Sequence, residues 1–180
     1  MPVASNAAAE AAGDVRPNRN HAALAEAAAR AGGMDAGFRN AARALRLLFH
    51  LDNGSWAESF VTAADAARSG AMPAGDKARL WGHLAHHARL TAAGRFGADL
   101  AASSERIAII LRACGLGLFE AIGIWAKVQT HLIRIILTDD RMSNRLVRRD
   151  AYAALGAWIL SETALVAHYF NRDGGARLAV

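Results

Sequence analysis

The stretch from residue 94 to residue 132 reads GRFGADLAASSERIAIILRACGLGLFEAIGIWAKVQTHL, and it decides the fold. Large apolar side chains recur in it at intervals of three and four residues, the spacing at which they share one face of an α-helix. Gly115-Leu116-Gly117 interrupts this pattern, because glycine is a poor helix former. The stretch therefore predicts two helices, over residues 98–113 and 118–137, and the second is the most apolar in the chain.

The composition extends the helical prediction to the whole chain. Alanine supplies 44 of the 180 residues, whereas there are only 3 prolines and 2 tyrosines. Alanine is the strongest helix former, and the residues typical of strands are sparse. An apolar fraction of 53% with 21% charged residues excludes global disorder, and a single cysteine excludes a disulfide scaffold. We therefore expect an all-α protein.

The length of the chain fits one domain, which we place at residues 34–171. Apolar residues at helical spacing predict its other helices over residues 36–50, 56–68, 76–93 and 145–171. Residues 1–33 are rich in alanine and carry few large apolar side chains, so we expect a flexible leader with a weakly docked helix over residues 21–31. Residues 172–180 are expected to form a loose tail.

Cysteine usage and hydropathy bear on the compartment. The single cysteine, Cys114, cannot form an internal disulfide, which fits a reducing compartment. The first 20 residues lack the apolar segment of a secretory signal, and no run of about 18 uncharged apolar residues is present. We expect a cytoplasmic protein without a membrane partner.

Motifs for catalysis and metal binding are missing from the sequence. Cys114 has no histidine nearby along the chain, and neither Gly-x-Ser-x-Gly nor a phosphate-binding glycine loop occurs. His83 and His87 are four residues apart, which places two imidazoles on one helix face, where they could hold zinc. No third ligand accompanies them, so we expect a half-exposed polar face and no metal. We also expect that the protein is not an enzyme.

A basic cluster raises the question of a nucleic-acid partner. Arg141, Arg145, Arg148 and Arg149 lie close together in the sequence, and the formal net charge of the chain is +5. Such a cluster could follow phosphates, but the aromatic side chains that stack on single-stranded bases are not interleaved with it. We expect a solvated basic surface, and a nucleic-acid partner is disfavoured.

Residues 94–132 also carry a series of short motifs in a fixed order. The series consists of Gly94-x-Phe96, Arg106-Ile107, Gly115-Leu116 and Ala121-Ile122-Gly123-x-Trp125. It resembles the sensor-globin domain of globin-coupled sensors and protoglobins, in which the last motif is Tyr-Ile-Gly-x-Tyr. The resemblance covers about residues 76–171, and its spacing holds without a gap from Gly94 to Trp125. It implies a globin-like fold and a role in signalling.

The resemblance also implies where haem would bind. In the family, the haem-ligating histidine stands at the position that Leu111 occupies here. Leucine has no lone pair for iron, so we expect no haem bound in the family manner and no other cofactor. The candidate lining of a ligand pocket is Phe60, His87, Leu100, Ile107, Leu111, Leu116, Ile122 and Trp125.

The last two helices predict a homodimer. Apolar residues cover most of the circumference of the helix over residues 118–137, and such a helix is either central in the core or shared with a partner. In sensor globins these two helices pair with their mates as an antiparallel four-helix bundle, and the resemblance implies the same here. The expected interface residues are Ile122, Trp125, Ile133, Ile136, Trp158 and Leu165.

The sequence thus predicts an all-α, globin-like single domain of six to seven helices that acts as a non-catalytic signalling module. No catalytic domain follows residue 171, so we expect any signal to leave through an unidentified downstream protein. Two alternatives stay open at this point. One is a haem-based gas sensor that uses another iron ligand, and the other is a helical adaptor or nucleic-acid-binding protein.

Overall fold

A computed structural model describes residues 17–33 and 38–172 of the chain. This part contains seven α-helices, one 3-10 helix and no strand, which confirms the predicted all-α class with six to seven helices. The helices are α2 (Arg19–Ala31), α3 (Phe38–Asp52), α4 (Ser55–Ala66), α5 (Ala74–Ala92), α6 (Ala98–Ala113), α7 (Leu118–Thr138), the 3-10 helix η1 (Asp140–Met142) and α8 (Arg145–Arg172). Their ends lie within two residues of the predicted ones.

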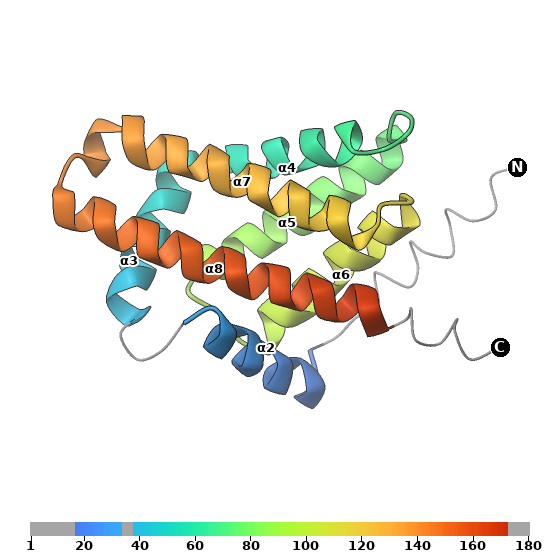
Figure 1. Ribbon diagram of the computed structural model, residues 1–180, viewed down its shortest axis with the longest axis horizontal. Coiled ribbons are helices and arrows are strands. Elements are labelled where there is room, and N and C mark those ends of the chain that lie inside the picture. Colours follow the sequence, from blue (N-terminus) through green and yellow to red (C-terminus); the bar gives the residue numbers. More distant parts are fainter. Residues whose placement is uncertain (1–16, 34–37, 173–180) are drawn as a thin grey trace, which may run out of the picture.

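The long helices α7 and α8 form the front layer of the molecule (Figure 1). They run side by side in opposite directions and are joined at one end by η1. Helix α8 also contacts α2, α3 and α6, whereas α7 contacts α3 and α4. Among the described helices, none combines the length and the hydropathy that a membrane span requires.

Three tryptophans form the centre of the core. Trp56 of α4, Trp125 of α7 and Trp158 of α8 are completely buried. Their ring centroids lie 5.5–6.1 Å apart, with the first two rings stacked and the third perpendicular to them. Phe49 packs edge-on against Trp158 at 4.9 Å, and Phe60 does the same against Trp125 at 5.0 Å. Aromatic packing therefore joins α3, α4, α7 and α8 at one place.

The helix expected over residues 21–31 is present as α2, but it belongs to the packed domain, so its assignment to a leader outside the domain is wrong. The helix lies against α6 and α8 and buries His21, Ala25 and Ala28. The prediction relied on large apolar side chains, whereas α2 docks through small ones that allow close approach. Gly32, just after the helix, is so close to α8 that an added Cβ would lie 2.3 Å from Ser161 Oγ. Residues 1–16 and 173–180, which include most of the expected tail, are outside the described residues.

Replacement of a central tryptophan should destabilise the fold strongly. We expect Trp158→Ala to lower the free energy of unfolding by about 3–5 kcal/mol, because it removes a buried ring and leaves a cavity. The matched control is Trp81→Ala, since the Trp81 side chain is 43% exposed on α5. Urea denaturation of both variants measures the difference. Equal losses for the buried and the exposed tryptophan would contradict this description of the core.

Candidate functional site

Most of the predicted pocket lining is packed into the core. The buried members of that set are Phe60, His87, Leu100, Ile107, Leu111, Leu116 and Trp125. Ile122 is 36% exposed on the outer face of α7, so its placement in an internal pocket is wrong. The rings of Phe60 and His87 lie 5.0 and 6.0 Å from that of Trp125, so these three side chains fill the space between them.

Four of the six predicted interface residues cannot meet a partner. Trp125, Ile136, Trp158 and Leu165 are buried inside the chain itself. The prediction was wrong for them because helical spacing identifies a stripe without showing which neighbour covers it. Within the chain, α3, α4 and α8 pack on α7, and α2, α3, α6 and α7 pack on α8. Ile133 is half-buried and Ile122 is exposed, so only this part of the predicted set reaches the surface.

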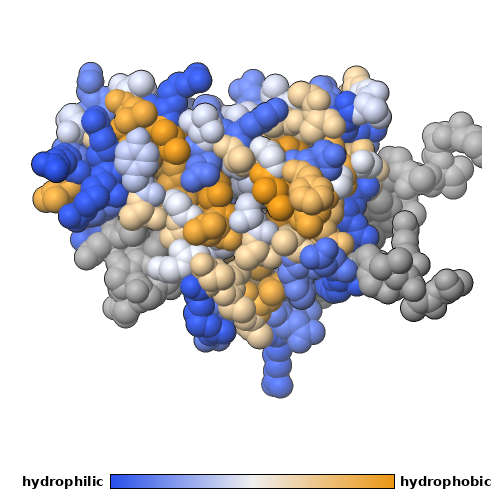
Figure 2. Space-filling model, viewed as in Figure 1, coloured by the Kyte–Doolittle hydropathy of each residue, from blue (hydrophilic) through white to orange (hydrophobic). Residues whose placement is uncertain are grey.

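The face formed by α7 and α8 nevertheless carries apolar side chains (Figure 2). Phe119 and Ile122 of α7 are 86% and 36% exposed, and Leu160 of α8 is 57% exposed. A shallow groove of ≈ 570 Å³ runs beside these residues. Its lining is Ala31, Ile122, Ala126, Gln129, Ile159, Leu160, Thr163 and Ala164.

The interior contains a histidine–carboxylate pair that is cut off from water. His87 Nε2 and Glu162 Oε1 lie 3.2 Å apart, and neither side chain is exposed. The two atoms are close enough for an ion pair but are not aligned for a hydrogen bond. His87 Nδ1 lies 3.2 Å from Ser103 Oγ, and Ser104 Oγ donates a 2.8 Å hydrogen bond to Glu162 Oε2. The pair therefore connects α5, α6 and α8.

The expected half-exposed histidine face on α5 is wrong for His87, whose imidazole is buried. His83 is half-buried, and burial followed by the nearby charge of Arg106 lowers the pKa of His83 below its usual value. Within residues 17–33 and 38–172, no three histidine, cysteine, aspartate or glutamate side chains gather as metal ligands.

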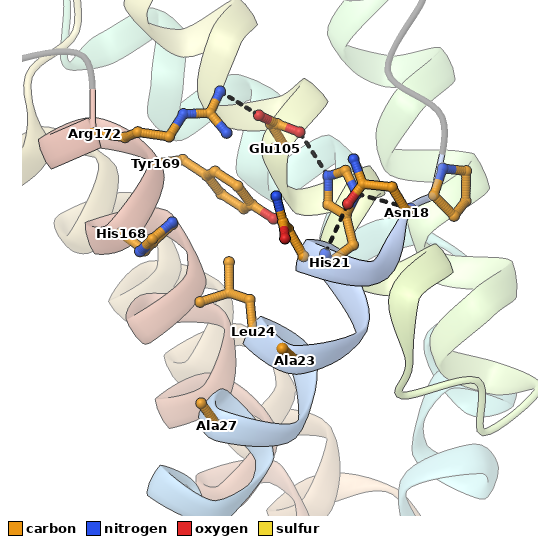
Figure 3. Close-up of a pocket in the computed structure, with 11 residues that line it drawn as sticks. Asn18, His21, Ala23, Leu24, Ala27, Glu105, His168, Tyr169 and Arg172 are labelled. Atoms are coloured by element: carbon orange, nitrogen blue, oxygen red, sulfur yellow. Dashed lines mark hydrogen bonds and ion pairs between the residues drawn. The ribbon is translucent and has the colours of Figure 1, made fainter.

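An open pocket of ≈ 1070 Å³ lies between the start of α2 and the end of α8 (Figure 3). It is lined by Asn18, just before α2, by His21 and Leu24 of α2, and by Glu105 of α6. Tyr169 and Arg172 of α8 form the opposite wall. Three helices distant in sequence thus bring an imidazole, a carboxylate, a phenol and a guanidinium together.

Glu105 is the centre of this cluster. His21 Nε2 lies 2.7 Å from Glu105 Oε2, and a guanidinium nitrogen of Arg172 lies 2.5 Å from Oε1. The backbone N–H of Asn18 donates a 3.1 Å hydrogen bond to His21 Nδ1. Since Nδ1 accepts that hydrogen bond, the ring carries its hydrogen on Nε2, which donates a hydrogen bond to Glu105. Both imidazole nitrogens are therefore engaged, and neither is available as a general base.

A second polar cluster lies where α3 meets α4. Ser55 Oγ donates to Asp52 Oδ1 at 2.6 Å, and His131 Nε2 of α7 lies 2.8 Å from the same oxygen. Asp52 Oδ2 also accepts the backbone N–H of Trp56, which caps the start of α4. His131 Nε2 also lies 3.0 Å from Ser55 Oγ, but the Ser55 hydroxyl donates its hydrogen bond to Asp52, so the serine is not arranged as a nucleophile with histidine as its base. This cluster therefore caps α4 and ties it to α7.

Sequence reasoning missed both clusters because their members are far apart along the chain. His21 and Glu105 are separated by 84 residues, and Asp52 and His131 by 79. The only local signal was Asn18-x-x-His21, whose side chains cap the start of α2 reciprocally. That signal predicts a helix start and contains no information about Glu105.

No protein-family model, no curated protein and no solved structure matches this chain. The likeness to sensor globins therefore stays a prediction from short motifs. The described side chains and the surfaces they form are therefore the basis for a functional proposal.

Tyr169 gives the pocket a measurable titration. Burial, followed by the charges of Glu105 and Glu162, raises the pKa of Tyr169 above the usual value of 10.0. The unfolded chain ionises this phenol near pH 10 whereas the folded chain keeps it neutral. The contribution of Tyr169 to stability is therefore complete below about pH 10 and is lost as the pH rises further.

We expect the phenolate absorbance of Tyr169 to appear only at a pH well above 10, or together with unfolding. The titration of the wild-type chain minus that of Tyr169→Phe isolates this signal, and Tyr152→Phe is the control. Ionisation of Tyr169 near pH 10 in a chain that is still folded by circular dichroism would contradict the described burial.

Proposed function

We propose that this chain is a non-catalytic signalling module of the sensor-globin type that works without haem and associates with a second copy through α7 and α8. The series of motifs between Gly94 and Trp125 supports the assignment to this type. The observation that carries the proposal is the interior, where packed side chains occupy the region in which a planar cofactor would have to lie.

The absence of an iron ligand supports a role without haem. Leu111 is completely buried, and it stands where the family carries its histidine. The imidazole of His87 lies in the interior, with Nδ1 3.2 Å from Ser103 Oγ and Nε2 3.2 Å from Glu162 Oε1. Iron ligation by His87 would break this network and would require Trp56, Trp125 and Trp158 to separate.

The polar clusters support a role without catalysis. His21 uses one nitrogen for the N–H of Asn18 and the other for Glu105. Ser55 donates to Asp52, and His131 Nε2 lies 2.8 Å from Asp52 Oδ1 and 3.0 Å from Ser55 Oγ. In neither cluster does a hydroxyl donate its hydrogen bond to a free base, so an input signal would leave the module through contacts with other proteins.

The face of α7 and α8 supports self-association. Ile122 and Leu160 are exposed at the groove, where small residues such as Ala126 and Ala164 leave space between them. A two-fold dimer pairs the same surface on both copies, so the projecting side chains of one copy meet the groove of the other. A stable interface of this kind buries about 1,200–2,000 Å² in total.

Haemin titration tests the first part of the proposal. We expect no sharp, stoichiometric Soret band with the purified chain, because neither space nor a free imidazole is present at Leu111. Leu111→His should not create such a band, since it places a polar ring without partners into a packed core. A tight stoichiometric band from the unchanged chain would contradict the proposal, and Ala substitutions of His83 and His87 would then identify the ligand.

Multi-angle light scattering tests the second part. At micromolar concentration we expect twice the chain mass of 19.0 kDa. Leu160→Glu should give the monomer mass with unchanged helicity, because it places a charge inside the apolar interface. Leu146→Glu is the matched control, since Leu146 is 60% exposed but lies in the first turn of α8, away from the groove. A monomeric wild-type chain would contradict self-association.

A further inference from the structure

Helix α2 makes directional contacts with the domain at both of its ends. At the first end, His21 donates to Glu105, which Arg172 also contacts. At the last end, Ser161 Oγ donates a 3.0 Å hydrogen bond to the carbonyl oxygen of Ala28, and Gly32 lies against α8. These contacts are specific in direction and position, so a substitution can remove each of them separately.

Between these ends, α2 packs through few and mostly small side chains. Ala25 is buried there, and Leu24 is only half-buried. They pack on a small apolar cluster with Leu165 and Tyr169, which is separate from the tryptophan core. A helix of 13 residues is marginal by itself in water, and segments with few buried apolar contacts open at a free energy far below that of global unfolding.

The same helix forms a wall of two different sites. Its first half, with Asn18, His21 and Leu24, lines the pocket between α2 and α8. Its last residue, Ala31, lines the groove on the face of α7 and α8 beside Ile122 and Leu160. Undocking of α2 would therefore remove one wall from each site at the same time.

We infer that α2 is a two-state latch that couples the pocket to the groove. When α2 is docked, both sites have all their walls; when it is undocked, both are incomplete. The docked state of α2 therefore strengthens self-association through the groove. By linkage, self-association favours the docked state of α2 by the same factor. The two-state behaviour of α2 is inferred from its own contacts alone, whereas its effect on self-association rests on the proposed function.

Hydrogen exchange of the full chain tests the latch. In the wild-type protein, we expect the amides of residues 23–31 to exchange much faster than those of α7 and α8, because α2 opens locally. His21→Ala removes the contact at the first end, and Gly32→Ala forces α2 and α8 apart at the last end. Each should speed exchange in α2 by about 10-fold or more and leave α7 and α8 unchanged.

Glu26→Gln is the matched control. It removes an exposed ion pair between Glu26 and Arg30 on the same helix, at a distance of 2.6 Å, without touching either end contact. Exchange in α2 should stay as in the wild-type chain. If α2 exchanges only at the rate of α7 and α8, or if His21→Ala and Gly32→Ala behave like Glu26→Gln, then α2 is no latch and the inference is overturned.

Sedimentation velocity with the same variants tests the coupling. We expect His21→Ala and Gly32→Ala to weaken dimerisation several-fold, and Glu26→Gln to leave it unchanged. Faster exchange in α2 with unchanged dimerisation would overturn the coupling to the groove and leave the proposed dimer intact. A monomeric wild-type chain would refute the dimer, while the exchange experiment would still decide whether α2 opens as a unit.

Discussion

The buried contact between His87 and Glu162 is the constraint on which the rest of the structure depends. A carboxylate in the interior is unfavourable unless a partner lies beside it, and the partner here is an imidazole 3.2 Å away on another helix. Ser103 and Ser104 of α6 complete the surroundings of the pair. His87 Nε2 and Glu162 Oε1 make no hydrogen bond, so each group has only the other as its nearest charged or polar partner on that side. Three helices therefore have to meet in one register to keep the two groups together.

The three tryptophans explain how such a centre is sheltered from water. The rings of Trp56, Trp125 and Trp158 lie 6.0–6.4 Å from that of His87, from three different helices. Within the described part of the chain, none of their indole N–H groups makes a hydrogen bond. Each such group is unfavourable by about 1–3 kcal/mol, so the packing of the large rings has to offset this loss. The interior is therefore filled by packed side chains, and contacts with other molecules have to be made at the outer surfaces.

The sequence predicts which helices form these surfaces, but it does not predict which side of each helix is exposed. The helices and their ends follow from apolar spacing and glycine breaks, because these signals are local. The side on which α7 is buried does not follow, since Ile122 and Ile136 share one stripe, yet the first is exposed and the second is buried. The neighbour that makes this difference is a property of the tertiary fold.

Helix α2 is a second case in which the local sequence does not predict the tertiary contacts. Its alanines and its single leucine indicated a helix with little to bury, and that description of its middle is correct. Its docking depends on Glu105, Ser161 and Arg172, which lie on helices that begin more than 60 residues later. Contacts of this kind have no pattern within one segment, so only the assembled structure identifies them.

A double-mutant cycle on His87 and Glu162 tests the central claim most directly. Urea denaturation would be measured for His87→Leu, Glu162→Met and the double variant. We expect each single change to lower the free energy of unfolding by about 3–5 kcal/mol, because it leaves the other group buried without its partner. The double variant should lose clearly less than the sum of the two, since an apolar pair fits the same space. Additive losses would mean that the two side chains do not depend on each other, which would contradict this account of the core.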